Sequence, residues 1–102
     1  MKKGNFAIYV RRDGELIPEM VSGYILDYGA FRFGVRKQYN QWSVTEISTG
    51  MLTGIYTNRK RDIIPTLWEK PELLEQIQKK INDHTDLFIE TAKERIREFY
   101  TA

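Results

Sequence analysis

The sequence predicts an α+β protein: an antiparallel four- or five-stranded meander followed by a long C-terminal amphipathic helix, or by a helical hairpin. Two observations support this prediction. Residues 5–56 hold short alternating apolar runs separated by turn signals. After Pro71 there is no Gly or Pro, and apolar residues recur every three or four positions. With 102 residues, the chain can bury one core, so we expect a single domain over 1–102.

The first predicted hairpin lies near the N-terminus. A strand is expected at residues 5–10, and Asp13-Gly14 is typical of a type I′ turn. Pro18 cannot donate a ladder hydrogen bond. We therefore expect an edge or a bend there, before a second strand at about residues 20–27.

Three further strands complete the predicted sheet over 1–56. Residues 31–36 alternate apolar with basic or glycine positions, which predicts a half-buried strand with a basic outer face. The next strand contains Trp42, and residues 51–56 supply a fifth. Gly50 and Gly54 resemble a phosphate loop only superficially, because no Lys-Ser/Thr pair follows them. A strand end with glycine at positive φ is the better interpretation.

Helical signals fill the remainder of the chain. Residues 57–70 are expected to form a connector with a short helix capped by Asn58, and Pro71 suits the first position of the helix over 71–102. The apolar phase survives residues 82–85, which favours one long helix, although a hairpin with Thr85 as N-cap remains open. An end left uncovered by the sheet predicts a homodimer through this helix. The apolar stripe consists of Leu74, Ile77, Ile81, Phe88, Ala92, Ile96 and Phe99.

Composition excludes several classes of site. The chain has no cysteine and a single histidine, His84, so disulfides, thiolate zinc sites and cysteine nucleophiles are excluded, and a histidine metal site would need a second chain. No catalytic constellation stands out, so we expect no enzyme, no cofactor and no metal. Arg11-Arg12 interrupts the N-terminal apolar run, which argues against a signal peptide or membrane span and favours a cytoplasmic protein.

Basic residues are concentrated in the first part of the chain. Residues 1–62 carry ten Lys/Arg against six Asp/Glu. Basic side chains interleaved with aromatic ones on a sheet can contact phosphates and stack on bases, while a solvated basic face is the alternative. The candidate nucleic-acid-binding residues are Arg36, Lys37, Tyr39, Arg59, Lys60 and Arg61.

Acidic residues follow the face of the predicted helix opposite its apolar stripe. Carboxylates spaced about a turn apart can imitate a phosphate backbone and bind a protein with a basic groove. A solvated face with pairs such as Glu75 and Lys79 is the alternative. The candidate partner-binding residues are Glu72, Glu75, Asp83, Asp86, Glu90 and Glu94.

A local pattern resembles known proteins. Residues 31–54 contain FGVRK and then WSVTEISTG, which resembles small uncharacterised proteins of Gram-positive phages, plasmids and conjugative elements. Some proteins of such elements, including the anti-CRISPR proteins, inhibit host defence nucleases by binding the effector. The resemblance implies a stoichiometric inhibitor and transfers no residue roles. We therefore expect a non-enzymatic protein-binding module, with a small nucleic-acid-binding accessory protein as the alternative.

Overall fold

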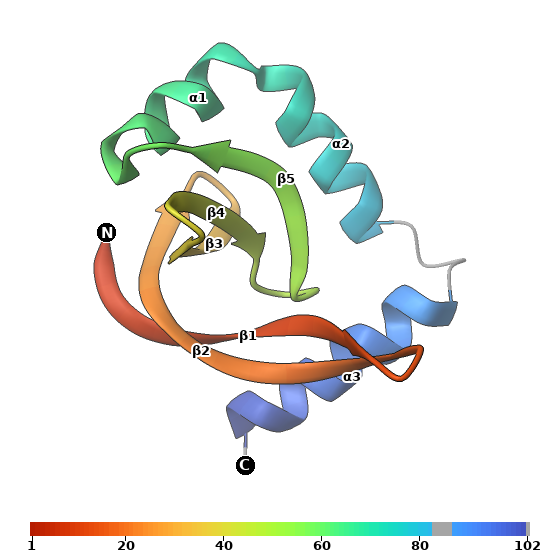
Figure 1. The fold of residues 1–102 in the computed structure, drawn as a ribbon. Coiled ribbons are helices and arrows are strands. Elements are labelled where there is room, and N and C mark those ends of the chain that lie inside the picture. The colour runs from red at the N-terminus through yellow and green to blue at the C-terminus, as the bar shows by residue number, and fades with distance from the viewer. Residues whose placement is uncertain (83–86, 102) are drawn as a thin grey trace.

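Five antiparallel strands in chain order form one sheet, and helices follow it, so the predicted α+β class and five-stranded meander are confirmed (Figure 1). The computed structural model describes residues 1–82 and 87–101. The elements are β1 (Lys2–Arg12), β2 (Glu15–Tyr28), β3 (Phe31–Gln38), β4 (Gln41–Glu46), β5 (Met51–Thr57), the 3-10 turn η1 (Lys60–Asp62), α1 (Ile63–Glu69), α2 (Pro71–Asn82) and α3 (Leu87–Thr101).

Two of the hairpins turn through two residues in the left-handed region. Asp13 and Gly14 have φ of 53° and 80° between β1 and β2, as the Asp-Gly pair predicts. Tyr39 and Asn40 have φ of 52° and 64° between β3 and β4. Positive φ at both positions is the geometry of a type I′ turn, whose twist matches that of the flanking strands.

The expected edge at Pro18 is confirmed, because β3 does not pair with this part of β2, but the expected bend before a strand start near residue 20 is wrong, since β2 already begins at Glu15. Pro18 lies inside β2, opposite Tyr9 of β1. The N–H of Tyr9 points away from β2, because it donates to the carbonyl of Gly50 at 3.1 Å. The pair is thus one that exchanges no hydrogen bonds, and β3 pairs with β2 only from Tyr24 onward. The missing N–H of Pro18 therefore removes no ladder bond.

The main core lies on one face of the sheet. Paired residues share a face, so Leu26, Phe33 and Glu46 lie on the same side. Helices α1 and α2 cover this face (Figure 1). The buried cluster combines Leu26, Phe33, Val35, Val44 and Ile55 of the sheet with Ile63, Leu67 and Ile77 of the helices.

The opposite face of β3 is not the basic surface that we expected. Gly34 is buried because the ring of Phe6 lies on it, and an added Cβ would come within 2.4 Å of that ring. Arg32 is exposed and pairs with Asp27 at 3.4 Å, while Arg36 is half-buried. The curvature of the sheet thus folds β1 across β3.

The connector differs in its caps from the expectation. Asn58 does not cap the short helix, since the N-cap of η1 is Arg59 and no side chain caps it. The Thr57 hydroxyl donates to the Arg59 carbonyl at 2.8 Å. Pro71 is the first residue of α2, as predicted. Within the described residues, no helix is long and apolar enough to cross a membrane.

One long C-terminal helix is not confirmed. Helix α2 ends at Asn82 and α3 begins at Leu87. The Lys93 ammonium donates to the carbonyl of Ile81 at 2.6 Å, whereas a straight helix would separate these residues by about 18 Å. The two helices therefore bend back toward each other. The predicted cap Thr85, like His84, lies outside the described residues.

The expected core positions of the C-terminal region are partly confirmed. Ile77 and Ile96 are buried, and Leu74 and Ile81 are half-buried. The side chain of Phe88 lies outside the described part of the chain. Ile96 does not join the main core, because α3 packs along β1 and the turn before β5 (Figure 1).

Polar bonds attach α3 to the first hairpin. The N–H of Ala7 donates to the Tyr100 hydroxyl at 2.7 Å. The guanidinium of Arg95 donates to the carbonyl of Leu16 at 3.3 Å. Since Ala7 and Tyr9 both point their N–H groups away from β2, Tyr100 and Gly50 together cover part of the free edge of β1.

Candidate functional site

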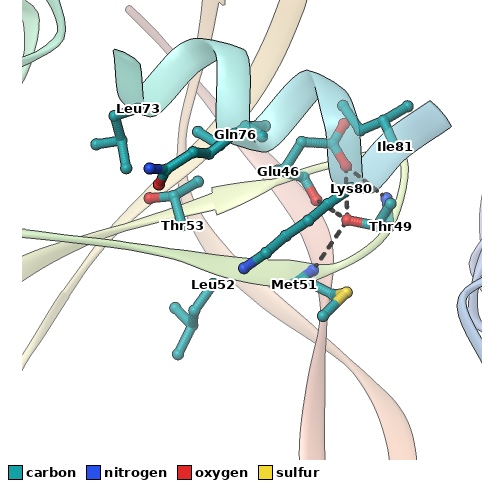
Figure 2. Close-up of a pocket in the computed structure, with 10 residues that line it drawn as sticks. Glu46, Thr49, Met51, Leu52, Thr53, Leu73, Gln76, Lys80 and Ile81 are labelled. Atoms are coloured by element: carbon teal, nitrogen blue, oxygen red, sulfur yellow. Dashed lines mark hydrogen bonds between the residues drawn. The ribbon is translucent and has the colours of Figure 1, made fainter. Parts of the chain in front are cut away.

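The turn between β4 and β5 is built around its own buried carboxylate. Glu46 accepts from the N–H groups of Ser48 and Thr49 at 3.0 and 2.8 Å and from both hydroxyls at 2.6 Å. Figure 2 shows the bonds among Glu46, Thr49 and Met51. Gly50 completes the turn at a φ of 67°. The loop is thus held by internal bonds, as a strand end would be.

A small cavity adjoins this turn beneath α2. Its lining includes Glu46, Thr49, Leu73 and Ile77, and its volume is about 50 Å³ (Figure 2). Ligand pockets for small molecules usually measure about 300–1,000 Å³, and a water needs about 10–15 Å³. This space fits a few waters rather than a metabolite.

Cationic residues from separate strands meet at one end of the sheet. Lys37 of β3 pairs with Trp42 of β4, and Trp42 pairs with Thr57 at the end of β5. The chain then enters the basic triplet that starts at Arg59. Strand pairing therefore gathers the two basic segments that the sequence placed some twenty positions apart. We call Lys3, Arg36, Lys37, Lys60 and Arg61 the cationic end.

Lys60 anchors the start of the helical segment to the sheet. Its ammonium lies 3.7 Å from the centre of the Tyr24 ring and 5.8 Å from that of Trp42. The two rings are 6.0 Å apart and inclined at 56°. A cation over aromatic faces is attracted by the ring quadrupole. Lys3 pairs with Tyr24, so it lies on this same face.

The sequence-predicted basic residues do not form one flat surface. Arg36 pairs with Ser43, on the face opposite to Lys37. Arg59 forms an ion pair with Asp62 at 3.0 Å. Lys37 and Arg61 are exposed. These two are therefore the cations of the set that extend most freely from the sheet end.

Two contributors were missed from the sequence. Lys3 and Tyr24 join the cationic end only through the pairing of β1 with β2. The predicted first strand began at Asn5, so Lys3 lay before it and had no predicted strand partner. The register of the Asp13-Gly14 turn was the available signal, because it aligns Lys3 with Tyr24.

Tyr39 occupies the tip of the β3–β4 hairpin next to Lys37. It is 90% exposed. Its φ of 52° places a bulky side chain in a region that such residues rarely adopt. The predicted aromatic partner of the basic residues is therefore fully available to a ligand.

The acidic candidates do not form the continuous row that one helix would have produced. Glu72 and Glu75 are exposed on α2, and Glu94 is exposed on α3. Asp83 and Asp86, and the side chain of Glu90, lie outside the described part. Because α2 and α3 are separate helices, the three described carboxylates do not share one helix face.

An apolar pair is exposed on α1. Ile64 and Trp68 are one helical turn apart and are 41% and 75% exposed. Both follow Arg61 closely in the chain. This pair was not predicted as a site, although the spacing of four between the two residues within a helical segment is visible in the sequence.

The remaining chemistry in the described part is sparse. No group of three or more His, Cys, Asp or Glu side chains is placed there to hold a metal ion. Burial raises the pKa of Tyr9, against the opposing effect of Arg95. Burial also raises the pKa of Tyr100, while its bond from Ala7 and the charge of Arg32 act in the opposite direction.

Comparisons with protein-family models, curated proteins and solved structures found no match to this chain.

Proposed function

We propose that the protein is a non-enzymatic binding module that contacts nucleic acid through the cationic end. The observation that carries this proposal is the register that joins Lys37, Trp42 and Thr57 and so brings the basic triplet beside β3. Phosphates would lie against Lys37 and Arg61, which are both exposed. Charge contacts of this kind supply most of sequence-independent affinity.

The competing acidic surface receives less support. Its six residues were grouped on the assumption of one long helix, and α2 and α3 are separate. The cationic end, in contrast, is assembled by strand pairing. For this reason we favour nucleic acid over a basic protein groove as the ligand.

Salt dependence tests the proposal. Fluorescent 12-nucleotide single strands and 12-base-pair duplexes are titrated with the protein from 20 to 200 mM salt. Removing two phosphate contacts with Lys37→Ala/Arg61→Ala should reduce the slope of log affinity against log salt by about 1.5, since each contact contributes about 0.7–0.9. The matched control is Lys79→Ala/Lys80→Ala, two exposed lysines on α2.

Two results decide the matter. Equal slopes for the two double variants would place the phosphates elsewhere and contradict the assignment of the cationic end. No binding of the unaltered protein at 20 mM salt would contradict nucleic-acid binding altogether.

A second candidate is a protein-binding inhibitor of the kind that the resemblance implies. Ile64 and Trp68 favour it, because tryptophan is enriched among residues that dominate protein interfaces. The test is a cleavage assay with a purified CRISPR effector nuclease and increasing amounts of the protein. Inhibition that saturates near equimolar protein and is lost in Trp68→Ala would support this candidate. Activity unaffected at a tenfold excess would exclude that target.

Self-association is compatible with either candidate. Phe99 and Tyr100 near the end of α3 are both exposed, and a second copy could cover them as the sequence suggested. Light scattering in the binding buffer measures the mass directly. A monomer at all concentrations used would contradict the homodimer.

A further inference from the structure

The two type I′ turns of the sheet have similar backbone conformations but differ in their side chains. The first turn residue has a φ of 53° at Asp13 and 52° at Tyr39. Asp-Gly is a preferred pair for this turn, because Asp tolerates the left-handed region and Gly has no Cβ. Tyr39-Asn40 places a large ring where the first hairpin has a short polar side chain.

Folding does not account for the ring at this position. In the left-handed region the Cβ approaches the following carbonyl, so a bulky residue is strained there. A strained residue persists when packing or function offsets its cost. Tyr39 is 90% exposed, and so its ring gains almost no packing against the protein. Packing within the chain therefore does not explain the choice of this residue, whereas contact with a ligand outside the chain would.

The surroundings of the ring identify the kind of contact. Tyr39 follows Arg36 and Lys37 on the same hairpin, and Trp42 is the second residue of the returning strand β4. An exposed aromatic ring beside cations is the arrangement that single-stranded nucleic acid uses, since the ring stacks on a base while the cations contact phosphates. In a duplex each base face is already covered by its neighbours.

We propose that Tyr39 stacks on an unpaired base of a single-stranded nucleic acid whose phosphates lie along the cationic end. This proposal rests on the proposed function and makes it more specific. It assigns single strands as the preferred ligand and the tip of the β3–β4 hairpin as the reader of an exposed base. DNA and RNA share the chemistry that this contact needs.

The experiment compares a turn that keeps the ring with one that loses it. The variants are Tyr39→Phe, which retains the ring, and Tyr39→Asn/Asn40→Gly, which installs a preferred type I′ pair without it. Each is titrated against 12-nucleotide single strands of DNA and of RNA and against a 12-base-pair DNA duplex. Thermal unfolding of each variant is recorded in the same buffer.

The expected pattern separates function from stability. Tyr39→Phe should bind single strands within about twofold of the unaltered protein. Tyr39→Asn/Asn40→Gly should bind them about 5- to 150-fold more weakly, the range that corresponds to one base stack. Its duplex affinity should stay within about twofold, and its melting temperature should rise because the strain is relieved. A single strand carrying 2-aminopurine should lose fluorescence on binding only when the ring is present.

Three outcomes would overturn the proposal. If the variant without the ring binds single strands normally while Lys37→Ala/Arg61→Ala binds weakly, the stacking role is wrong and the proposed function stands. If duplex and single-strand affinities fall equally, the ring does not select unpaired bases. If the unaltered protein binds no oligonucleotide at 20 mM salt, both proposals fail together.

Discussion

We predict that Glu46→Gln destabilises the fold, and the hydrogen bonds around the carboxylate determine by how much. The carboxylate is 5% exposed and accepts from two N–H groups and two hydroxyls. Glutamine keeps one acceptor oxygen and replaces the other with a donor. The hydroxyls can rotate to accept from this new donor, but a backbone N–H cannot. One N–H group is therefore left facing an NH₂ group.

The two sides of the carboxylate differ in their access to water. Thr49 is buried and Ser48 is exposed, so the amide should keep its oxygen toward Thr49 and turn its NH₂ toward Ser48. Water can then satisfy the Ser48 N–H. Glu46→Gln therefore loses only the extra strength of hydrogen bonds to a charged acceptor and the geometry of one bond, which should lower the free energy of unfolding by about 1–2 kcal/mol. Glu46→Ala leaves the buried Thr49 N–H without its acceptor and opens a cavity, so about 3–4 kcal/mol is expected.

Urea denaturation followed by tryptophan fluorescence measures both values. Glu75→Gln on the exposed face of α2 is the matched control and should change the free energy of unfolding by less than about 0.5 kcal/mol. The reasoning is refuted if Glu46→Gln behaves like this control. It is also refuted if Glu46→Ala is no worse than Glu46→Gln, because the order of the two variants follows directly from the bonds to Thr49.

Three further predictions concern packing and pH. Gly34→Ala should destabilise the fold by about 1–3 kcal/mol because the added Cβ meets the Phe6 ring, and the loss should be smaller when Phe6→Leu is also present. Denaturation of the two single variants and the double variant tests this, and strictly additive losses would contradict it. Ile96→Ala should lower the free energy of unfolding by about 2–4 kcal/mol in the same assay. A decrease of less than about 0.5 kcal/mol would mean that α3 does not stabilise the fold. The raised pKa values of Tyr9 and Tyr100 stabilise the folded state fully below the ordinary value of 10.0, and this contribution is lost as pH rises through the folded pKa. Unfolding free energies between pH 8 and 11 should therefore fall less steeply in Tyr100→Phe than in the unaltered protein, and identical slopes would contradict the assignment.

Local chemistry explains why the sheet could be predicted from sequence. The Asp13-Gly14 turn and the start of α2 at Pro71 depend on residues adjacent in the chain. The wrong start of the second strand, placed after Pro18 instead of at Glu15, has a different origin. Whether a proline breaks a ladder depends on the strand beyond it, and β3 pairs with β2 only from Tyr24. No local pattern reveals how far a neighbouring strand extends.

Tertiary contacts explain the other differences. The apolar phase across residues 82–85 predicted one helix, because phase reports only which side of each helix is buried. The bond from Lys93 to the Ile81 carbonyl, which requires the helices to approach each other, cannot be read from phase. Similarly, the burial of Gly34 depends on Phe6, a residue from a strand that does not pair with β3.

The cationic end was predicted in part, and one of its features was overlooked. Arg36-Lys37 and the triplet were visible as local pairs, but their proximity needed the register of β4. That Arg36 and Lys37 point to opposite faces follows from strand alternation alone and could have been predicted. The backbone conformation of Tyr39 required the structure.

The geometry of Lys60 determines which substitutions can test binding. Its ammonium lies over Tyr24 and Trp42, two aromatic residues that pack against the main core. Arg59 is likewise engaged by Asp62 at the start of the helical segment. Reversing the charge of the whole triplet would therefore disturb the attachment of η1 to the sheet as well as the surface charge. A loss of binding in that variant would not distinguish unfolding from lost phosphate contacts. Lys37 and Arg61 are exposed, so their replacement changes the electrostatic field at the sheet end while leaving this attachment in place.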